Sequence, residues 1–278
     1  MDKSLRYDEI GNWSEMKLEI LRKYSTSYST ILSGQKKVRL KHVYIDAFSG
    51  AGKHVSRETG EFVPGSPVNA LNVNPPFAEY HFIDLDGAKV KALADAAGVR
   101  SDVHTYEGDC NEVLKKILPL VRYEDYRRAL CILDPYGLHL NWEIIHQIGQ
   151  MKSVEIFLNF PVADINRNVL WRYAEKVPKE QIERMNAFWG DESWWNVAYK
   201  KQPTLFGDED VKTSNEAVAE GFRARLRDVA GFKHVPQPVA MKNTHNAIVY
   251  YLFFASHNAT GEKIAKAIFK KYNESGRV

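Results

Sequence analysis

The residues best suited to chemistry lie at the end of one apolar stretch, in the pattern Asp46-x-Phe48-x-Gly50-x-Gly52. Residues 43–45, just before it, are typical of a strand that is buried on both faces. The two glycines allow a sharp turn and let the backbone come close to a bound molecule. The pattern lacks the Gly-Lys-Ser/Thr of a phosphate-binding loop. The acid favours a ligand that carries hydroxyl groups or a positive charge.

Three further apolar stretches end in an acid or lead to one, at Asp84, Asp109 and Asp134, and a fifth stretch ends in Asn159. Apolar residues recur at helical spacing between these stretches, in residues 90–97, 113–118 and 144–148. Alternating strands and helices predict a parallel sheet with helices on both faces. Such sheets bind their ligands at the carboxyl ends of the strands.

Over most of its length the chain resembles the class I S-adenosylmethionine-dependent methyltransferases. The resemblance implies an α/β, Rossmann-like fold with a mostly parallel seven-stranded sheet and an antiparallel last strand. It also implies S-adenosyl-L-methionine as cofactor. In that family the acid before the glycine turn lies near the methionine part of the cofactor. The acid of the second strand binds the ribose hydroxyls, and the acid after the third contacts the adenine amino group. These positions match Asp46, Asp84 and Asp109.

The residue types suit these roles, because a carboxylate accepts two hydrogen bonds from a diol and acids hold a cationic sulfonium better than lysines do. Asp86 is the alternative to Asp84, since side chains alternate along a strand and only one of the two can point at the sugar. We predict no metal site. The predicted cofactor contacts are Asp46, Ala47, Phe48, Ser49, Gly50, Gly52, Asp84, Leu85, Asp109 and Cys110.

The chain also resembles, more closely, the three-Cys-motif partner protein family, which is named for a protein encoded beside its members. The matching motifs beside the glycine turn are Trp13-x3-Lys17-x3-Leu21-x2-Tyr24, Gly65-Ser66-Pro67, Asp134-Pro135-Tyr136-Gly137 and Tyr250-Tyr251-Leu252-Phe253-Phe254-Ala255. This resemblance implies a genetically linked three-Cys-motif protein as partner. It says little about the substrate.

The predicted reaction centre is Asp134, Pro135 and Tyr136. The segment is similar to the Asp/Asn-Pro-Pro-Tyr/Phe motif of nucleic-acid amino-methyltransferases, without its second proline, and to the Asp-Pro-Phe-Gly of tRNA guanine N2-methyltransferases. In such motifs the acid and a backbone carbonyl hold the target amino group while the ring stacks on the base. Acceptors on the amine hydrogens direct its delocalised lone pair toward the methyl group. A simple turn after a strand would explain Pro135 and Gly137, but not the acid and the ring together.

We interpret residues 1–278 as a single methyltransferase-like domain with a helical N-terminal cap (1–40), a cofactor-binding core (41–162), a helical insertion (163–238), and a closing hairpin with a C-terminal helix (239–278). Residues 53–64 are polar and predict a loop over the cofactor site, either a solvated excursion or a substrate lid. Ser66 is the predicted N-cap of the next helix and Pro67 its first residue.

The insertion combines four tryptophans with many basic residues. Interleaved aromatic and basic side chains suit contact with nucleic acid. The tryptophans equally suit the core that a subdomain of this size needs. The tryptophans are Trp171, Trp189, Trp194 and Trp195, and the basic residues include Arg167, Arg172, Lys176, Arg184, Lys200, Lys201, Arg223, Arg225 and Arg227.

The composition, 44% hydrophobic in 278 residues, suits one large core. The net charge of +3 permits an acidic partner without requiring one. Cys110 and Cys131 form no metal-binding spacing and are predicted to be reduced core thiols. The charged N-terminus lacks an apolar signal core and no apolar run reaches membrane-spanning length, so we expect a cytoplasmic protein with no membrane partner.

We therefore predict an S-adenosylmethionine-dependent methyltransferase that acts on an exocyclic amino group of a nucleic-acid base. One alternative is a methyltransferase for a small molecule or a protein, which differs in the acceptor of the methyl group. The other is a non-catalytic, cofactor-binding partner subunit of the genetically linked protein, which would bind the cofactor without turnover.

Overall fold

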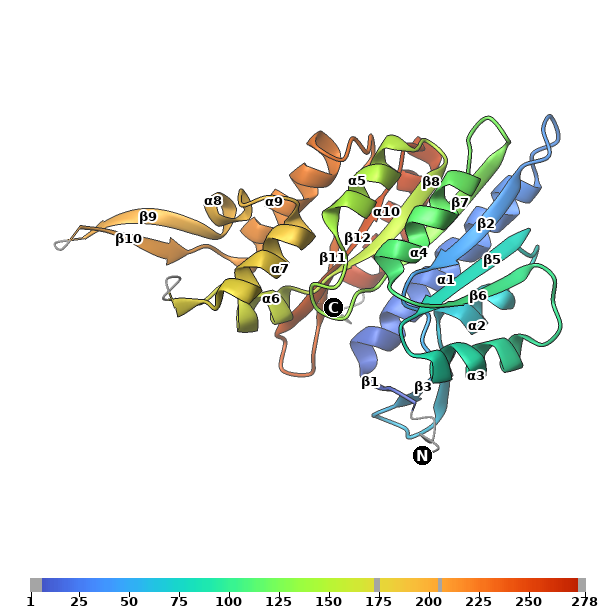
Figure 1. The fold of residues 1–278 in the computed structure, drawn as a ribbon, viewed down its shortest axis with the longest axis horizontal. Coiled ribbons are helices and arrows are strands. Elements are labelled where there is room, and N and C mark those ends of the chain that lie inside the picture. The colour runs from blue at the N-terminus through green and yellow to red at the C-terminus, as the bar shows by residue number, and fades with distance from the viewer. Residues whose placement is uncertain (1–6, 173–175, 205–206, 275–278) are drawn as a thin grey trace.

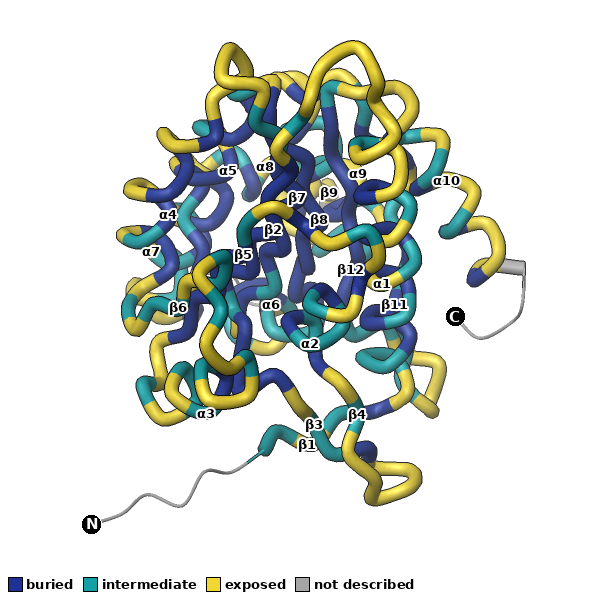
Figure 2. Tube along the Cα trace, turned by 90° about the vertical axis from the view of Figure 1, so that its right-hand side faces the viewer, coloured by how far each residue is buried: buried dark blue, intermediate teal, exposed yellow. Residues whose placement is uncertain are grey.

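The computed structural model describes residues 7–172, 176–204 and 207–274. A seven-stranded sheet runs through the middle and helices cover both of its faces, which gives three layers (Figure 1). Most residues of the central strands are buried (Figure 2). The outermost residues of the predicted cap and closing region, 1–6 and 275–278, lie outside the described residues.

The large sheet has the strand order β11-β12-β8-β7-β2-β5-β6. Its inner neighbours pair in parallel, whereas β12 is antiparallel to both β8 and β11. A mostly parallel sheet of seven strands with an antiparallel last strand confirms the predicted class I methyltransferase fold. The bounds are β2 (Lys41–Asp46), β5 (Glu79–Asp84), β6 (Val103–Glu107), β7 (Arg127–Leu133), β8 (Val154–Phe160), β11 (Val239–Lys242) and β12 (Ile248–Ala255).

One face of the sheet is covered by α1 (Asn12–Ser33), α2 (Ser66–Leu71), α3 (Gly87–Ala97) and α10 (Ala259–Glu274). The other face is covered by α4 (Cys110–Ile117), which a short 3-10 turn η1 (Leu118–Leu120) follows, by α5 (Trp142–Gln150), and by helices of the insertion. Because apolar side chains pack against both faces, the middle strands are apolar along most of their length. The three-layer arrangement leaves the carboxyl ends of the parallel strands for a site.

Residues 53–64 form a β-hairpin, so the prediction of a loop was wrong. β3 (Lys53–Ser56) pairs antiparallel with β4 (Phe62–Pro64) and parallel with β1 (Glu9–Ile10) from the N-terminal segment. The parallel partner comes from far away in the sequence, so a local pattern does not reveal it. The next helix also begins one residue early: Gly65 is the N-cap and Ser66 lies within α2. Proline is tolerated at position 67 because backbone N–H groups in the first turn of a helix have no acceptor within the helix, so the missing N–H of Pro67 breaks no hydrogen bond.

The described part of the insertion, residues 163–172, 176–204 and 207–238, contains four helices and one feature that was not predicted. The helices are α6 (Val162–Asn168), α7 (Lys179–Trp189), α8 (Trp194–Ala198) and α9 (Asn215–Asp228). The strands β9 (Tyr199–Thr204) and β10 (Gly207–Lys212) form an antiparallel pair that extends from one end of the molecule (Figure 1). The insertion is helical as predicted but also carries this strand pair, which the sequence did not reveal because the strands are too polar to show an apolar alternation. Within the described residues, no helix has both the length and the apolar character needed to cross a membrane.

Candidate functional site

The glycine turn follows β2 directly, and both glycines have positive φ angles, +61° at Gly50 and +78° at Gly52. This region of backbone conformation favours glycine. Asp46 is completely buried beneath the turn, and its Oδ1 accepts a hydrogen bond from the Phe48 amide at 3.2 Å. No described residue makes a hydrogen bond of good geometry to Asp46 Oδ2, which is also buried. Burial raises the pKa of Asp46 to about 7.

Asp84 ends β5 and fixes the same turn from the neighbouring strand. Its Oδ2 accepts from the Gly50 amide at 2.8 Å and its Oδ1 from the Asp86 amide at 2.9 Å. Each carboxylate oxygen keeps a further lone pair. Asp86 serves instead as the N-cap of α3, where its Oδ1 accepts from the Ala88 amide at 2.9 Å. Both acids line one cavity at the strand ends, and Asp84 is the one whose carboxylate is fixed directly to the glycine turn.

A cavity of about 420 Å³ lies at the ends of β2, β5 and β6, and we call it the strand-end cavity. Asp109 lines it and also caps α4, with Oδ1 accepting from the Asn111 amide at 2.8 Å. Cys110 lines it as a buried thiol, and burial raises its pKa to about 12. The free and buried state of Cys110 and Cys131 confirms the predicted core thiols. The cavity combines an apolar wall with carboxylates at its edge.

A second cavity, of about 590 Å³, lies beside the first, and we call it the Lys17 cavity. Phe48 and Tyr136 line both cavities, so the two adjoin. Asp134, Pro135 and Tyr136 all line the Lys17 cavity. Six of the predicted cofactor contacts line the strand-end cavity: Ala47, Phe48, Asp84, Leu85, Asp109 and Cys110. Phe48, Ser49 and Gly50 line the Lys17 cavity, while Asp46 and Gly52 line neither.

Lys17, on the buried face of α1, forms an ion pair and hydrogen bond with Asp134 Oδ2. The Lys17 side chain is 10% exposed and that of Asp134 is 30% exposed. The Asp134 carboxylate keeps the pKa of Lys17 above its usual range against the opposing effect of burial. Lys17 Nζ also lies 5.4 Å from the centre of the Tyr250 ring. Helix α1 thus supplies a positive charge to the predicted reaction centre.

Tyr136 is 59% exposed, and its ring stands at the junction of the two cavities. Its hydroxyl donates to Asp8 Oδ2 at 3.2 Å, and Lys89 Nζ donates to the same oxygen at 2.7 Å. Gly137 follows with φ +57°, and a Cβ there would stand 2.8 Å from Asp164 Oδ2. The turn after Tyr136 therefore requires glycine.

Sequence reasoning did not identify several residues of the Lys17 cavity as site residues, among them His54 and Asn159. Asn159 is 8% exposed, and its Oδ1 is buried with no hydrogen-bond partner among the described residues. The polar end of an apolar strand was its only signal. Lys17 had a clearer signal, because it is a charged residue on the apolar face of a helix.

The tryptophans of the insertion serve mostly as core. Trp189 and Trp194 are each 1% exposed, whereas Trp171 is 37% exposed. The three arginines of α9 are bound within the chain: Arg223 to Glu220, Arg225 to Asp191 and Arg227 to Asp228. These arginines therefore already have acidic partners within the chain, while Arg167 lines the Lys17 cavity.

Comparisons with known proteins support the fold. The chain matches no protein-family model and no curated protein sequence. It is similar to protein LPL1258 from Legionella pneumophila, with 14% identity over 95% of this chain and 92% of that chain and a TM-score of 0.59. Weaker similarities, at a TM-score of 0.36, are to the N-methyltransferase NodS from Bradyrhizobium japonicum (10% identity, 87% and 98% covered) and to an S-adenosylmethionine-dependent methyltransferase from Mesorhizobium loti (12% identity, 83% and 97% covered).

Proposed function

We propose that the protein is an S-adenosylmethionine-dependent methyltransferase that acts on an exocyclic amino group of a nucleic-acid base. The observation that carries the proposal is the pair of adjoining cavities, one edged by strand-end acids and the other containing Asp134, with Phe48 and Tyr136 between them. Two joined cavities suit a reaction in which a cofactor and an acceptor meet end to end.

The strand-end cavity fits the nucleoside part of the cofactor. Asp84 would hold the ribose hydroxyls with the lone pairs that its two amide hydrogen bonds leave free. Asp109 would accept from the adenine amino group, with Leu85 and Cys110 against the ring. Asp46 is buried and lines neither cavity, so its effect on the cofactor would be indirect: it would hold the glycine turn in place through the hydrogen bond from the Phe48 amide. When bound, the cofactor supplies an electrophilic methyl group.

The Lys17 cavity fits an acceptor that carries an amino group. The Lys17 ion pair involves Oδ2 of Asp134, which leaves Oδ1 for an amine hydrogen. The buried, unpartnered Oδ1 of Asn159 offers a second acceptor in the same cavity. Two acceptors on one amino group localise its lone pair, and an oriented lone pair is what attack on the methyl group needs. Lys17 would fix the orientation of the Asp134 carboxylate through their ion pair.

A flat base is the acceptor that best suits the exposed ring of Tyr136, since aromatic side chains stack on bases of any sequence. Arg57 and Arg167 line the same cavity and could meet a phosphate backbone. One observation favours the non-catalytic alternative: a carboxylate already engaged by Lys17 has one oxygen fewer for an amine.

The experiment is incubation with methyl-labelled S-adenosylmethionine and, separately, total cellular RNA, DNA and protein, with and without the protein encoded beside this one. We expect label in RNA or DNA, recovered after digestion as a base methylated on its amino group. Label in protein or small molecules alone would support the methyltransferase alternative. Cofactor binding without transfer under every condition would support the partner-subunit alternative.

A further inference from the structure

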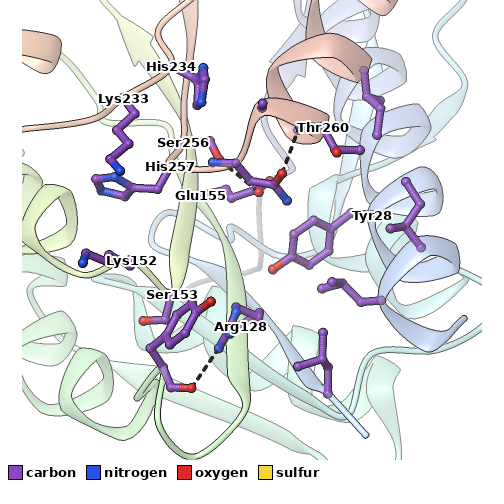
Figure 3. Close-up of a pocket in the computed structure, with 18 of the residues that line it drawn as sticks. Tyr28, Arg128, Lys152, Ser153, Glu155, Lys233, His234, Ser256, His257 and Thr260 are labelled. Atoms are coloured by element: carbon purple, nitrogen blue, oxygen red, sulfur yellow. Dashed lines mark hydrogen bonds between the residues drawn. The ribbon is translucent and has the colours of Figure 1, made fainter. Parts of the chain in front are cut away.

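A cavity of about 650 Å³ lies at the amino ends of the parallel strands, opposite the candidate site, and we call it the rear cavity. Its lining residues come from the amino ends of β7 and β8, the end of α1 and the start of α10. Figure 3 shows these residues around the cavity. A volume of this size is in the range of small-molecule sites.

One side of the rear cavity is positively charged. Lys152 and Lys233 are exposed, line the cavity and form no ion pair with a described residue. Both lysines lie near His257 (Figure 3). Burial lowers the pKa of His257, and the positive charges of the two lysines lower it further. Helix α10 begins here at Ala259 and adds the positive end of its dipole. This side of the cavity suits a phosphate or carboxylate group.

The other side offers acceptors and a free hydroxyl. Glu155 is 8% exposed, and its two oxygens accept from the Tyr24 hydroxyl at 2.5 Å and the Ser256 hydroxyl at 3.0 Å. The Tyr28 side chain is 6% exposed and points into the cavity, but its hydroxyl has no hydrogen-bond partner among the described residues (Figure 3). A hydroxyl that lines a cavity and has no protein partner is available to donate a hydrogen bond to a ligand or accept one from it.

Between the two sides, the wall is apolar and contains a stacked pair. Ile31, Leu32 and Leu40 line it, and the Arg128 guanidinium lies 3.5 Å from the centre of the Tyr123 ring. Such surfaces pack well against a flat ring. We propose that the rear cavity binds a small organic phosphate with a flat body that carries amino or hydroxyl groups, such as a nucleoside monophosphate. Its phosphate lies at Lys152 and Lys233, and its polar edge faces Tyr28 and Glu155.

The test is calorimetry with the four ribonucleoside monophosphates as probes, on the wild-type chain and three variants. The double variant Lys152→Glu/Lys233→Glu removes the cationic side, and Tyr28→Phe removes only the free hydroxyl. Lys91→Glu/Lys116→Glu is the matched control, because it makes the same change of charge at exposed lysines that do not line the cavity. Circular dichroism checks that each variant is folded.

We expect at least one nucleotide to bind with a Kd below about 1 mM, and the Lys152/Lys233 double variant to bind it about tenfold or more weakly. The control pair should change affinity by less than about threefold, because distant surface charges are screened by salt. Tyr28→Phe should weaken binding by about threefold or more. Inorganic phosphate should bind more weakly than the nucleotide.

The proposal is overturned if none of the four nucleotides binds below about 1 mM, or if the Lys152/Lys233 double variant binds like the control pair. Equal affinity for inorganic phosphate and for the nucleotide would overturn the claim that the cavity binds the flat part of the ligand. A nucleotide bound in the strand-end cavity instead would be insensitive to all of these variants. The outcome is independent of the proposed methyltransferase activity, because no variant touches either cavity of that site.

Discussion

Asp46→Asn should stabilise the unliganded protein, and increasingly so as the pH rises. Burial raises the pKa of Asp46 from its ordinary value of 3.8 to about 7 in the folded chain. Between these two values the unfolded chain has lost the proton and the folded chain has kept it. Folding then takes up a proton, so the free energy of unfolding falls as the pH rises. Above about pH 7 the full cost of the buried charge is present.

The size of the effect follows from the same two values. About three pH units, at 1.36 kcal/mol for each, give a cost of about 4 kcal/mol above pH 7 and almost none near pH 4. Asparagine has nearly the same shape and keeps an oxygen for the Phe48 amide, but it carries no charge. The difference in unfolding free energy between variant and wild type should therefore grow by about 4 kcal/mol between these pH values.

The assay is urea unfolding of both proteins, followed by circular dichroism at several pH values across this interval. Asp95→Asn is the matched control, because it removes an aspartate from the exposed surface of α3. Its difference from wild type should vary by less than about 0.5 kcal/mol over the interval. The reasoning about Asp46 is refuted if the Asp46→Asn difference is equally flat.

Three further predictions concern the two cavities of the candidate site. Calorimetry should show that Asp84→Ala weakens binding of S-adenosylhomocysteine by about tenfold or more and that Asp86→Ala weakens it by less. The reverse order would assign the ribose hydroxyls to Asp86. Lys17→Met should lower the free energy of unfolding by about 1–3 kcal/mol, because it leaves the half-buried Asp134 carboxylate without its partner. A double-mutant cycle with Asp134→Asn should show an interaction energy between the two positions, and additive effects would count against a functional ion pair. Tyr136→Phe should lower kcat/KM by only a few-fold because the ring remains, and Tyr136→Ala by about a hundredfold or more; two mild effects would argue against stacking.

The strands of the sheet were predictable because they are buried on both faces, which forces apolar runs such as residues 129–133. Helix α1 was predictable for a similar reason: its apolar residues recur at helical spacing, and Gly34 ends it. The acids at the strand ends were found because parallel strands bring their carboxyl ends to one edge.

Other features depend on partners that are far apart in the sequence. The Lys17–Asp134 ion pair joins positions 117 residues apart, and no local pattern connects them. Strand β1 pairs with β3 through a register that only the folded chain defines. Asp46 stays a predicted cofactor contact from its place before the turn, but the sequence did not show that the fold buries it completely beside the Phe48 amide. Local patterns predict elements well and long-range pairs poorly.

The central claim is that Asp134 acts on the acceptor and not on the cofactor. The most direct measurement compares wild type, Asp134→Ala and a control, Asp208→Ala on the exposed strand β10, for methyl transfer and for S-adenosylhomocysteine affinity. We predict that Asp134→Ala lowers transfer by about a hundredfold or more while the affinity stays within about threefold of wild type, because the lost interaction belongs to the transition state. Transfer that survives in Asp134→Ala, or a folded Asp134→Ala that no longer binds S-adenosylhomocysteine, would contradict the account.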